Sequence, residues 1–395
     1  MIKFNAVFVF FLLVKLVSCQ INPIEMFEKF KGGEPQILTQ AVEVPFELEA
    51  SHIIKIPVAV NGVKLEMVLD TGGITMLDES VCDSLQLEII EIPNQQAGFT
   101  KLTEIVLGET RVFGMKAGVT NFNQTYKFAQ SGMIGSDYLR FFQTEIDYAR
   151  QMLVFNNPSL MLSESELEHV FQMEIILPYF PTIELVLNDT YPLPGMIDTG
   201  LSYGFVLPVS WKEKLADNQE ITFLEADGYF ARWPWNDNPR NYLSVMPQIS
   251  MGDIVLENVP VLFAEIPSFL DQDVLLIGKY FLDDFLLRLD FQNRQLKLTE
   301  TEGPDYDLLY SAGLMISTRE ENIKITGVWE NSPAREAGLK PGHLLKKIND
   351  KGFEEISQKE ISDILMNREI KSVKITLEEE GEEKEYFLEK RLLIP

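Results

Sequence analysis

A short motif that occurs twice constrains the fold of this chain more than any other feature. Val68–Gly72 reads VLDTG, and Met196–Gly200 reads MIDTG. A second motif also recurs further along the chain, because Met133–Leu139 resembles Leu276–Leu282. Self-similarity of this kind indicates repeated structural units. The sequence therefore predicts two related units that pack as a pseudo-dimer.

Both units are predicted to consist of β-strands. Runs rich in β-branched and aromatic residues, bounded by Asn-Gly, Gly or Pro, are typical of strands. Such runs are Ile54–Val60, Leu65–Leu69, Ile183–Leu187 and Leu286–Phe291. The two motifs lie farther apart in the second unit than in the first, so the second unit carries an insertion. We place it in the Trp-, Pro- and Asn-rich segment Ala231–Pro239, whose composition is typical of a loop.

The duplicated Asp-Thr-Gly is interpreted as a catalytic feature. A single copy is a weak signal, because Asp and Gly are ordinary turn residues. Here each copy follows an apolar strand and precedes an apolar-apolar-Gly segment later in its own unit. Two adjacent carboxylates cannot both ionise cheaply, so one can act as general base on water while the other stays protonated. Asp70 and Asp198 are therefore the predicted catalytic pair, and they are expected to titrate as one unit.

These motifs resemble those of the pepsin–retropepsin superfamily of aspartic proteases. The resemblance covers about residues 40–300 and depends on both triplets, on Ile134-Gly135 and on Ile277-Gly278. It implies a mainly β, bilobal aspartic protease whose retropepsin-like lobes span residues 40–160 and 161–300. Each lobe would contribute one Asp to a shared site. Because both triplets lie in one chain, a monomer would be sufficient for activity, and no cofactor is implied.

The resemblance also assigns supporting roles within the triplets. Thr71 and Thr199 would link the two lobes through hydrogen bonds beneath the aspartates. Gly72 and Gly200 have no side chain, which lets the backbone approach the catalytic pair closely.

The chain departs from the pepsin pattern directly after each triplet. Pepsins usually have Ser or Thr there, whereas this chain has Gly73 and Leu201. Loss of a hydrogen-bond donor to the charged form raises a carboxyl pKa. The sequence therefore predicts an activity optimum in the mildly acidic to near-neutral range. Gln95–Phe99 is a candidate for a flap over the site, with Phe99 as the covering side chain, and an ordinary surface hairpin is the alternative.

The composition changes after Leu298. Thr299–Pro304 is polar and ends in Gly-Pro, which is typical of a linker. Residues 306–395 then resemble a PDZ domain of the bacterial type, on the basis of the long stretch from Ser332 to His343. Within it Ser332 is expected to cap a short helix that has Pro333 at its first position and ends at Gly338. As a separate domain, this segment is predicted to be removable without unfolding the two lobes.

The PDZ resemblance implies a groove for peptide C-termini. The loop Ala312-Gly313-Leu314 would present backbone N–H groups to the terminal carboxylate, and the peptide would add a strand to the sheet edge. A helix over residues 357–367 would form the other wall. Its apolar face carries Ile361, Ile364 and Leu365, which equally fit an ordinary core stripe. The chain also resembles bacterial envelope proteins that join such a protease to a PDZ domain.

Residues 1–19 have the layout of a secretory signal peptide. Lys3 precedes a mostly apolar run from Phe4 to Val14, and small residues follow. Leu16–Cys19 resembles a bacterial lipobox, in which Cys19 would be lipidated after cleavage. Ordinary cleavage near Gln20 is the alternative. The predicted location is the bacterial cell envelope, as a periplasmic or membrane-anchored protein, or otherwise the secreted fraction.

Charge and composition exclude several other functions. The net charge is −26, with 34 Lys and Arg against 60 Asp and Glu, whereas nucleic-acid binding needs a basic footprint. The two Cys and three His residues form no cluster with metal-ligand spacing, so we expect no metal site. No Gly-x-Ser-x-Gly elbow of a serine hydrolase occurs. The rival hypothesis is a non-enzymatic peptide-binding or scaffolding protein that kept the protease fold.

Overall fold

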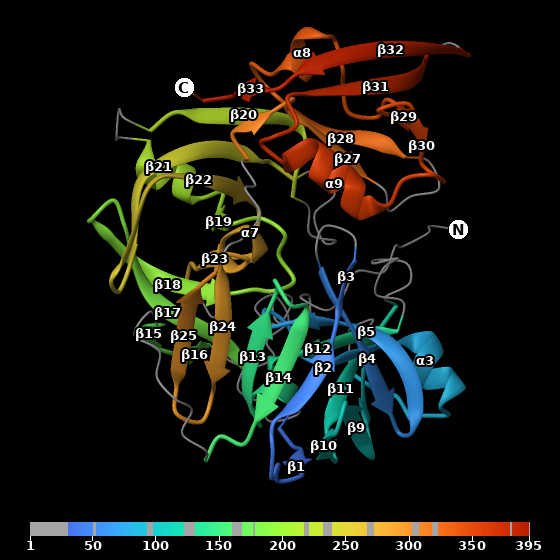
Figure 1. Ribbon diagram of the computed structural model, residues 1–395, viewed down its shortest axis with the longest axis vertical. Coiled ribbons are helices and arrows are strands. Elements are labelled where there is room, and N and C mark those ends of the chain that lie inside the picture. The colour runs from blue at the N-terminus through green and yellow to red at the C-terminus, as the bar shows by residue number, and fades with distance from the viewer. Residues whose placement is uncertain are drawn as a thin grey trace.

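The computed structural model describes residues 31–49, 53–92, 98–121, 131–159, 168–176, 178–216, 221–231, 239–266, 272–301, 308–317, 323–379 and 381–394. These residues are mainly β with short helices, as the sequence predicts. We call residues 31–159 the first half, 168–301 the second half and 308–394 the C-terminal unit (Figure 1). The predicted signal peptide with Cys19 lies outside the described residues. Within the described part, no helix combines the length and apolar character needed to cross a membrane.

The first half is built on one large sheet. Its β4–β5 hairpin turns at Asn61-Gly62, and both residues have positive φ, as a tight Asn-Gly hairpin turn requires. Ile54, Ile56 and Val58 alternate along β4 and are buried, which fixes the face that packs on the core. The strands of this sheet are β1 (Glu34–Pro35), β3 (Glu47–Glu49), β4 (Ile53–Val60), β5 (Val63–Asp70), β6 (Met76–Asp78), β7 (Ile90–Glu91), β8 (Gly98–Lys101), β9 (Glu104–Leu107), β10 (Thr110–Phe113), β11 (Lys116–Thr120) and β12 (Gly132–Gly135). Two short helices, α3 (Glu79–Ser84) and α5 (Ser136–Leu139), follow β6 and β12.

The second half repeats the central part of this arrangement. In each half the strand before the triplet pairs in parallel with the strand of the apolar-Gly motif, as β5 with β12 and β18 with β23. The strands are β16 (Glu174–Ile176), β17 (Phe180–Leu187), β18 (Tyr191–Ile197), β19 (Phe205–Pro208), β20 (Phe223–Gly228), β21 (Tyr242–Met251), β22 (Ile254–Ala264) and β23 (Leu275–Ile277), with helices α6 (Trp211–Leu215) and α7 (Lys279–Leu282). The connection from β20 to β21 covers the predicted insertion, of which residues 232–238 lie outside the described part.

A six-stranded sheet joins the two halves. Its order is β15-β25-β24-β13-β14-β2, so β13 of the first half pairs antiparallel with β24 of the second. At the centre of that pairing Glu145 lies opposite Arg288, its counterpart when Gly135 is aligned with Gly278, which places a pseudo-twofold axis between them. The strands are β2 (Val42–Pro45), β13 (Gln143–Asp147), β14 (Met152–Asn156), β15 (Glu168–Gln172), β24 (Phe285–Asp290) and β25 (Gln295–Glu300).

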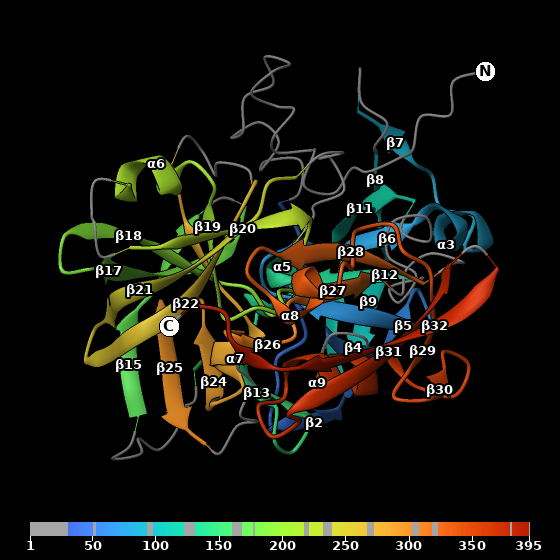
Figure 2. The same cartoon turned by 90° about the horizontal axis from the view of Figure 1, so that it is seen from above.

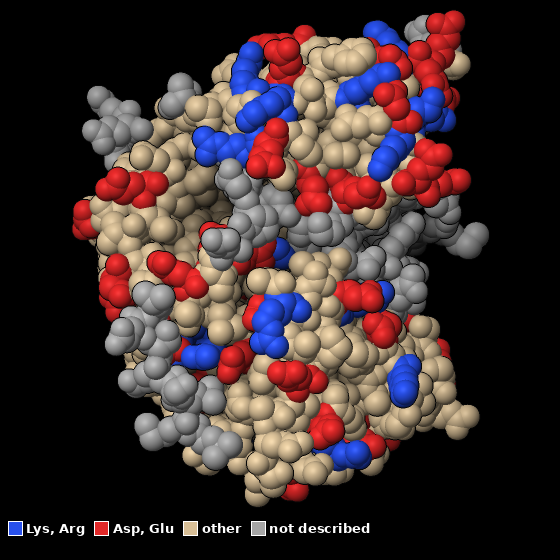
Figure 3. All heavy atoms as spheres, in the orientation of Figure 1, with Lys and Arg blue, Asp and Glu red and all other residues tan. Residues whose placement is uncertain are grey.

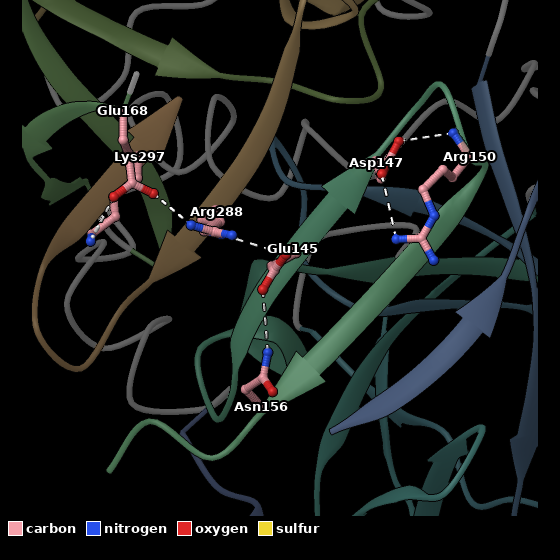
Figure 4. A network of polar contacts seen from close by, with 7 residues as sticks. All are labelled: Glu145, Asp147, Arg150, Asn156, Glu168, Arg288 and Lys297. Carbon is pink, nitrogen blue, oxygen red and sulfur yellow. Dashed lines mark hydrogen bonds and ion pairs between the residues drawn. The ribbon is translucent and has the colours of Figure 1, made fainter. Parts of the chain in front are cut away.

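The residues on this axis carry opposite charges. Arg288 Nε lies 3.4 Å from Glu145 Oε2, and Arg288 Nη1 lies 2.6 Å from Glu168 Oε1 (Figure 4). Lys297 adds a second cation to Glu168 at 3.0 Å. These side chains are largely withdrawn from solvent, so the network is better shielded from salt than a surface pair.

The C-terminal unit contains two short helices, and the capping residues at their ends can be recognised in the sequence. Ser332 Oγ accepts a hydrogen bond from the Arg335 N–H at the start of α8 (Pro333–Glu336), and Gly338 follows that helix with a φ of +79°. Ser357 and Glu360 form a reciprocal capping box at the start of α9 (Gln358–Met366). The strands are β26 (Tyr310–Ser311), β27 (Leu314–Ser317), β28 (Lys324–Trp329), β29 (Leu345–Ile348), β30 (Lys351–Gly352), β31 (Ser372–Glu379), β32 (Glu382–Glu389) and β33 (Arg391–Leu392).

The C-terminal unit is not packed as a separate body. Its strand β28 pairs antiparallel with β20, so the sheet of the second half runs on through β28 to β27. One hydrophobic cluster contains buried residues from both parts, among them Leu224, Phe230 and Trp329. Helix α9 also contacts β3 of the first half. Seen from above, the unit lies over both halves (Figure 2). The C-terminal unit therefore shares a sheet and a hydrophobic core with the second half.

Charged side chains are spread over the surface. On the face shown in Figure 3, acidic and basic residues are interspersed, and many of the basic ones lie over the C-terminal unit. Several cations of the C-terminal unit are paired, for example Lys347 with Glu383 and Arg335 with Asp227. Among the described residues on this face, charges of both signs are therefore mixed.

Candidate active site

Each triplet begins at the end of a buried strand. Asp70 is the last residue of β5, and Asp198 directly follows β18. Parallel pairing sets Asp70 beside Gly135 of β12, and the Asp198 N–H donates to the carbonyl of Ile277 in β23. The apolar-Gly motif thus fixes the end of the strand that carries each aspartate.

The two triplets are joined by reciprocal hydrogen bonds. The N–H of Thr71 donates to Thr199 Oγ1 at 3.0 Å, and the N–H of Thr199 donates to Thr71 Oγ1 at 3.0 Å. The hydroxyls donate in turn to carbonyls of the opposite half, Thr71 to Ile197 at 2.7 Å and Thr199 to Leu69 at 3.4 Å. Both threonines are buried. This is the cross-link that the resemblance predicts for these two residues.

The glycines of the triplets leave room for the opposite carboxyl group. A Cβ added to Gly72 would lie 2.6 Å from Asp198 Cγ, and one added to Gly200 would lie 2.6 Å from Asp70 Cγ. Each aspartate Oδ1 also accepts an N–H from the glycine of its own triplet, at 2.8 Å for Gly72 and 3.0 Å for Gly200. The structure thus brings Asp70 and Asp198 together, and no larger residue fits at either glycine.

Burial and mutual repulsion set the charge of this pair. Burial raises the pKa of the Asp70 carboxyl, while hydrogen bonds from Gly72 and Gly200 and the contact with Asp198 oppose that rise. Burial, and then the charge of Asp70, raise the pKa of Asp198 well above its ordinary value of 3.8. The pair therefore retains a shared proton at pH values where ordinary aspartates are fully ionised. Both residues keep part of their surface accessible, so water can reach them.

Side-chain contacts that support the loop after each triplet were not predicted from the sequence. In the first half, the hydroxyl of Ser136 donates to the Thr71 carbonyl at 2.6 Å, and Asp137 Oδ1 accepts both the N–H and the hydroxyl of Thr75 at 2.7 Å. Burial raises the pKa of the Asp137 carboxyl to about 6, against these hydrogen bonds. These contacts could have been suspected from the polar Ser136-Asp137 pair, which directly follows Ile134-Gly135 at the end of a buried strand.

The second half uses different side chains at the corresponding positions. Tyr203 lies five residues after Asp198, as Thr75 lies five after Asp70, and Tyr280 lies two after Gly278, as Asp137 lies two after Gly135. The rings of Tyr203 and Tyr280 meet edge to face with centroids 6.4 Å apart. The support is therefore a pair of hydrogen bonds to a carboxyl group in the first half and an aromatic contact in the second half.

The position after the first triplet is crowded. A Cβ at Gly73 would lie 3.2 Å from Asp70 Oδ2 and 2.2 Å from the terminal methyl of Met133. Gly73→Ser therefore requires the end of Met133 to move, and it then places a hydroxyl beside Asp70. A donated hydrogen bond favours the ionised form, so we expect the acidic limb of the activity profile to move down by about one pH unit.

Gly73→Ala is the matched control for this prediction, because it adds the same Cβ without a hydroxyl. The measurement is kcat/KM against pH for the three proteins. Equal profiles for the Ser and Ala variants would show that the hydroxyl does not act on the pair.

The other sequence-predicted residues lie in several places. Leu201 is buried, and its N–H is a donor to Asp198. Of the flap candidate, residues 95–97 lie outside the described part. Gly98 and Phe99 belong to β8 and pair with β7, and the Lys116 ammonium lies 5.8 Å from the Phe99 ring.

The residues predicted to form the peptide groove lie in and beside β27 and in α9. Among the described residues, β27 pairs only with β28 and ends the sheet. Ala312 and Leu314 are buried, and Gly313 has a φ of +79°. The Gly313 N–H already donates to Ser311 Oγ at 3.0 Å, so this one donor of the predicted carboxylate loop is occupied. In α9, Ile361 and Leu365 are buried in the core and Ile364 packs at its edge.

Comparison with known proteins adds little to this geometry. No family model and no curated protein matches the chain. A solved structure of Basic 7S globulin from soybean is similar at a TM-score of 0.36 and 10% sequence identity, over 68% of this chain and 96% of that one. A likeness at this TM-score carries no argument about fold or function.

Proposed function

We propose that this chain is an aspartic endopeptidase with two retropepsin-like lobes and Asp70 and Asp198 as its catalytic pair. The single observation that supports this most is the close contact of the two carboxyls, held by reciprocal Thr71–Thr199 hydrogen bonds and admitted by two glycines. Two separate halves of the chain build the same geometry around one point. A pair of structural turn residues would not require this arrangement.

The chemistry follows from the shared proton. The ionised carboxyl accepts a proton from a water molecule as that water attacks the peptide carbonyl carbon. The protonated carboxyl donates a hydrogen bond to the carbonyl oxygen and then its proton. Because burial raises the pKa of both carboxyls, the pH window with one ionised and one protonated member lies at higher pH than for ordinary aspartates. Activity should rise as the first proton leaves and fall as the second leaves, giving a bell-shaped profile.

We propose further that the C-terminal unit is a PDZ domain that binds peptide or protein C-termini along β27. Among the described residues β27 pairs only with β28, at the end of the sheet, and this supports the proposal. The substrate would be a peptide or protein, and one chain would suffice for activity. Residues 1–19 would export the protein to a bacterial envelope, with Cys19 lipidated, and a mature chain that starts at an unmodified Gln20 would contradict lipidation.

A cleavage assay tests the proposed protease. The full-length mature chain is incubated with a proteome-derived peptide library across pH 3–8, with and without a statine-containing peptide that mimics the tetrahedral intermediate. We expect cleavage that the statine peptide inhibits and that EDTA and serine-protease reagents leave unchanged. If no peptide is cleaved while labelled C-terminal peptides bind, the rival interpretation of a binding or scaffolding protein is supported.

A further inference from the structure

The buried side chain of Tyr203 connects the loop after Asp198 to the C-terminal unit through Phe230. The hydroxyl of Tyr203 donates to the carbonyl of Phe230 at 2.8 Å. Phe230 follows β20, and its ring stacks on Trp329 with centroids 3.9 Å apart and planes 16° from parallel. All three residues are buried. The loop after Asp198 is thus linked to β28 by a hydrogen bond from Tyr203 to Phe230 and by the stacking of Phe230 on Trp329.

Trp329 is itself fixed from two sides. Its N–H donates to the carbonyl of Gly313 at 2.9 Å, in the predicted carboxylate loop. The next N–H, that of Glu330, donates to the carbonyl of Glu225 in β20 at 3.0 Å. Trp329 therefore sits where the peptide groove and the second half share backbone hydrogen bonds.

The loop that carries Tyr203 is tightly packed on its other side. The N–H of Gly278 donates to the Gly204 carbonyl and that of Lys279 donates to the Leu201 carbonyl, both at 2.8 Å. A Cβ on Gly278 would lie 2.1 Å from the carbonyl oxygen of Tyr203. The backbone of Tyr203 is thus packed directly against Gly278, within the loop that begins at Asp198.

The corresponding position in the first half has a different contact. There, Thr75 is held by Asp137 of the same half through two hydrogen bonds. In the second half, the hydroxyl of the corresponding Tyr203 reaches out to Phe230, which rests on the C-terminal unit. The first aspartate loop is thus supported within its own half, whereas the second is supported by Tyr280 of its own half and is also connected through Phe230 to the C-terminal unit.

We propose that Tyr203 is a positioning residue through which the C-terminal unit holds the Asp198 loop in its catalytic geometry. This inference depends on the proposed function, because it concerns the same pair of aspartates. It gives the C-terminal unit a role inside the active site in addition to any role in binding peptides.

Tyr203→Phe tests the proposal, because it removes the hydroxyl and keeps the ring. A less constrained Asp198 lies on average farther from Asp70, so the two carboxyls repel less and their two titrations approach each other. We expect kcat per active site, titrated with the statine peptide, to fall about tenfold, with KM changed less than twofold. The bell-shaped pH profile should become narrower. A variant that merely folds less completely would have fewer titrated sites but wild-type kcat per site and a wild-type profile.

Tyr138→Phe is the matched control. Tyr138 is also buried, and its hydroxyl is hydrogen bonded to Thr110 Oγ1 at 2.8 Å, within the first half. The Tyr138→Phe variant should lose about as much folding stability as Tyr203→Phe, but its pH profile of activity should not become narrower. Trp329→Leu, which removes the stacked ring from the other side, should narrow the profile in the same way as Tyr203→Phe.

The possible outcomes separate this inference from the proposed function. Wild-type kcat per titrated site and a wild-type pH profile in both Tyr203→Phe and Trp329→Leu would overturn the inference alone. Equal narrowing in the Tyr138→Phe control would overturn it as well, since the effect would then not be specific to this connection. A wild-type chain that cleaves no peptide would overturn the proposed function and the inference with it.

Discussion

Replacing either Asp70 or Asp198 by Asn is expected to lower kcat/KM for peptide cleavage about 1,000-fold or more, the scale of lost general acid–base catalysis. One carboxyl cannot both accept a proton from water and donate one to the substrate. The measurement is cleavage of a peptide identified in the library assay, with each variant at matched concentration. Near wild-type turnover in either variant would show that the assignment of the pair is wrong.

The stability of these variants provides an internal control. The pKa of Asp198 is raised in the folded state, so the stability this group contributes is present below the unfolded pKa near 3.8 and is lost as pH rises. Asp198→Asn has no proton to lose and should be at least as stable as the wild type above pH 4. We expect its thermal midpoint to exceed that of the wild type by more at pH 7 than at pH 4. An inactive but more stable variant would separate the loss of chemistry from unfolding.

Deleting residues 308–395 is expected to destabilise the rest of the chain, contrary to the modular organisation predicted from the sequence. The deletion exposes Leu224, Phe230 and the edge of β20. Each large apolar side chain contributes about 1.5–3 kcal/mol when buried, and 1 kcal/mol corresponds to about 2–4 °C in a domain of this size. We therefore expect the thermal midpoint to fall by more than about 10 °C, or the truncated chain to aggregate.

The control for the deletion is Arg335→Ala in the full chain. It breaks only the partly exposed salt bridge from Arg335 to Asp227, which spans the same junction at 2.6 Å. Exposed pairs of this kind contribute about 0–1 kcal/mol, so the midpoint should move by no more than a few degrees. A truncated chain as stable and active as the full chain would show that the shared sheet is not needed by the two halves.

The repeat allowed much of the site to be predicted. Two copies of a triplet after apolar strands predicted β5 and β18, and the resemblance supplied the Thr71–Thr199 hydrogen bonds that the structure contains. The predicted runs Ile54–Val60 and Leu286–Phe291 correspond to β4 and β24 within one residue at each end. Local signals of this kind depend on residues that are close in the sequence, which is why single-chain analysis finds them.

The junction between β20 and β28 could not be predicted in the same way. The paired residues are far apart in the sequence, and the Gly-Pro segment between them indicated a linker. One signal was present, because Gly228 and Gly327 pair directly across the junction. A Cβ on Gly228 would lie 2.1 Å from the Thr326 carbonyl oxygen, and one on Gly327 would lie 2.4 Å from that of Tyr229. Glycine within a strand often marks such a close approach of another backbone segment.

The charges on the pseudo-twofold axis determine which halves can assemble. A first half paired with a copy of itself would set Glu145 opposite Glu145, and a second half paired with its own copy would set Arg288 opposite Arg288. Like charges directly opposite on paired strands are destabilising, whereas the arrangement in one chain sets Glu145 against Arg288. The chain thus has pseudo-twofold symmetry in its backbone pairing here, but not in the charges of these two side chains. Pairing either half with a copy of itself would bring like charges together, so these charges favour the pairing of the first half with the second.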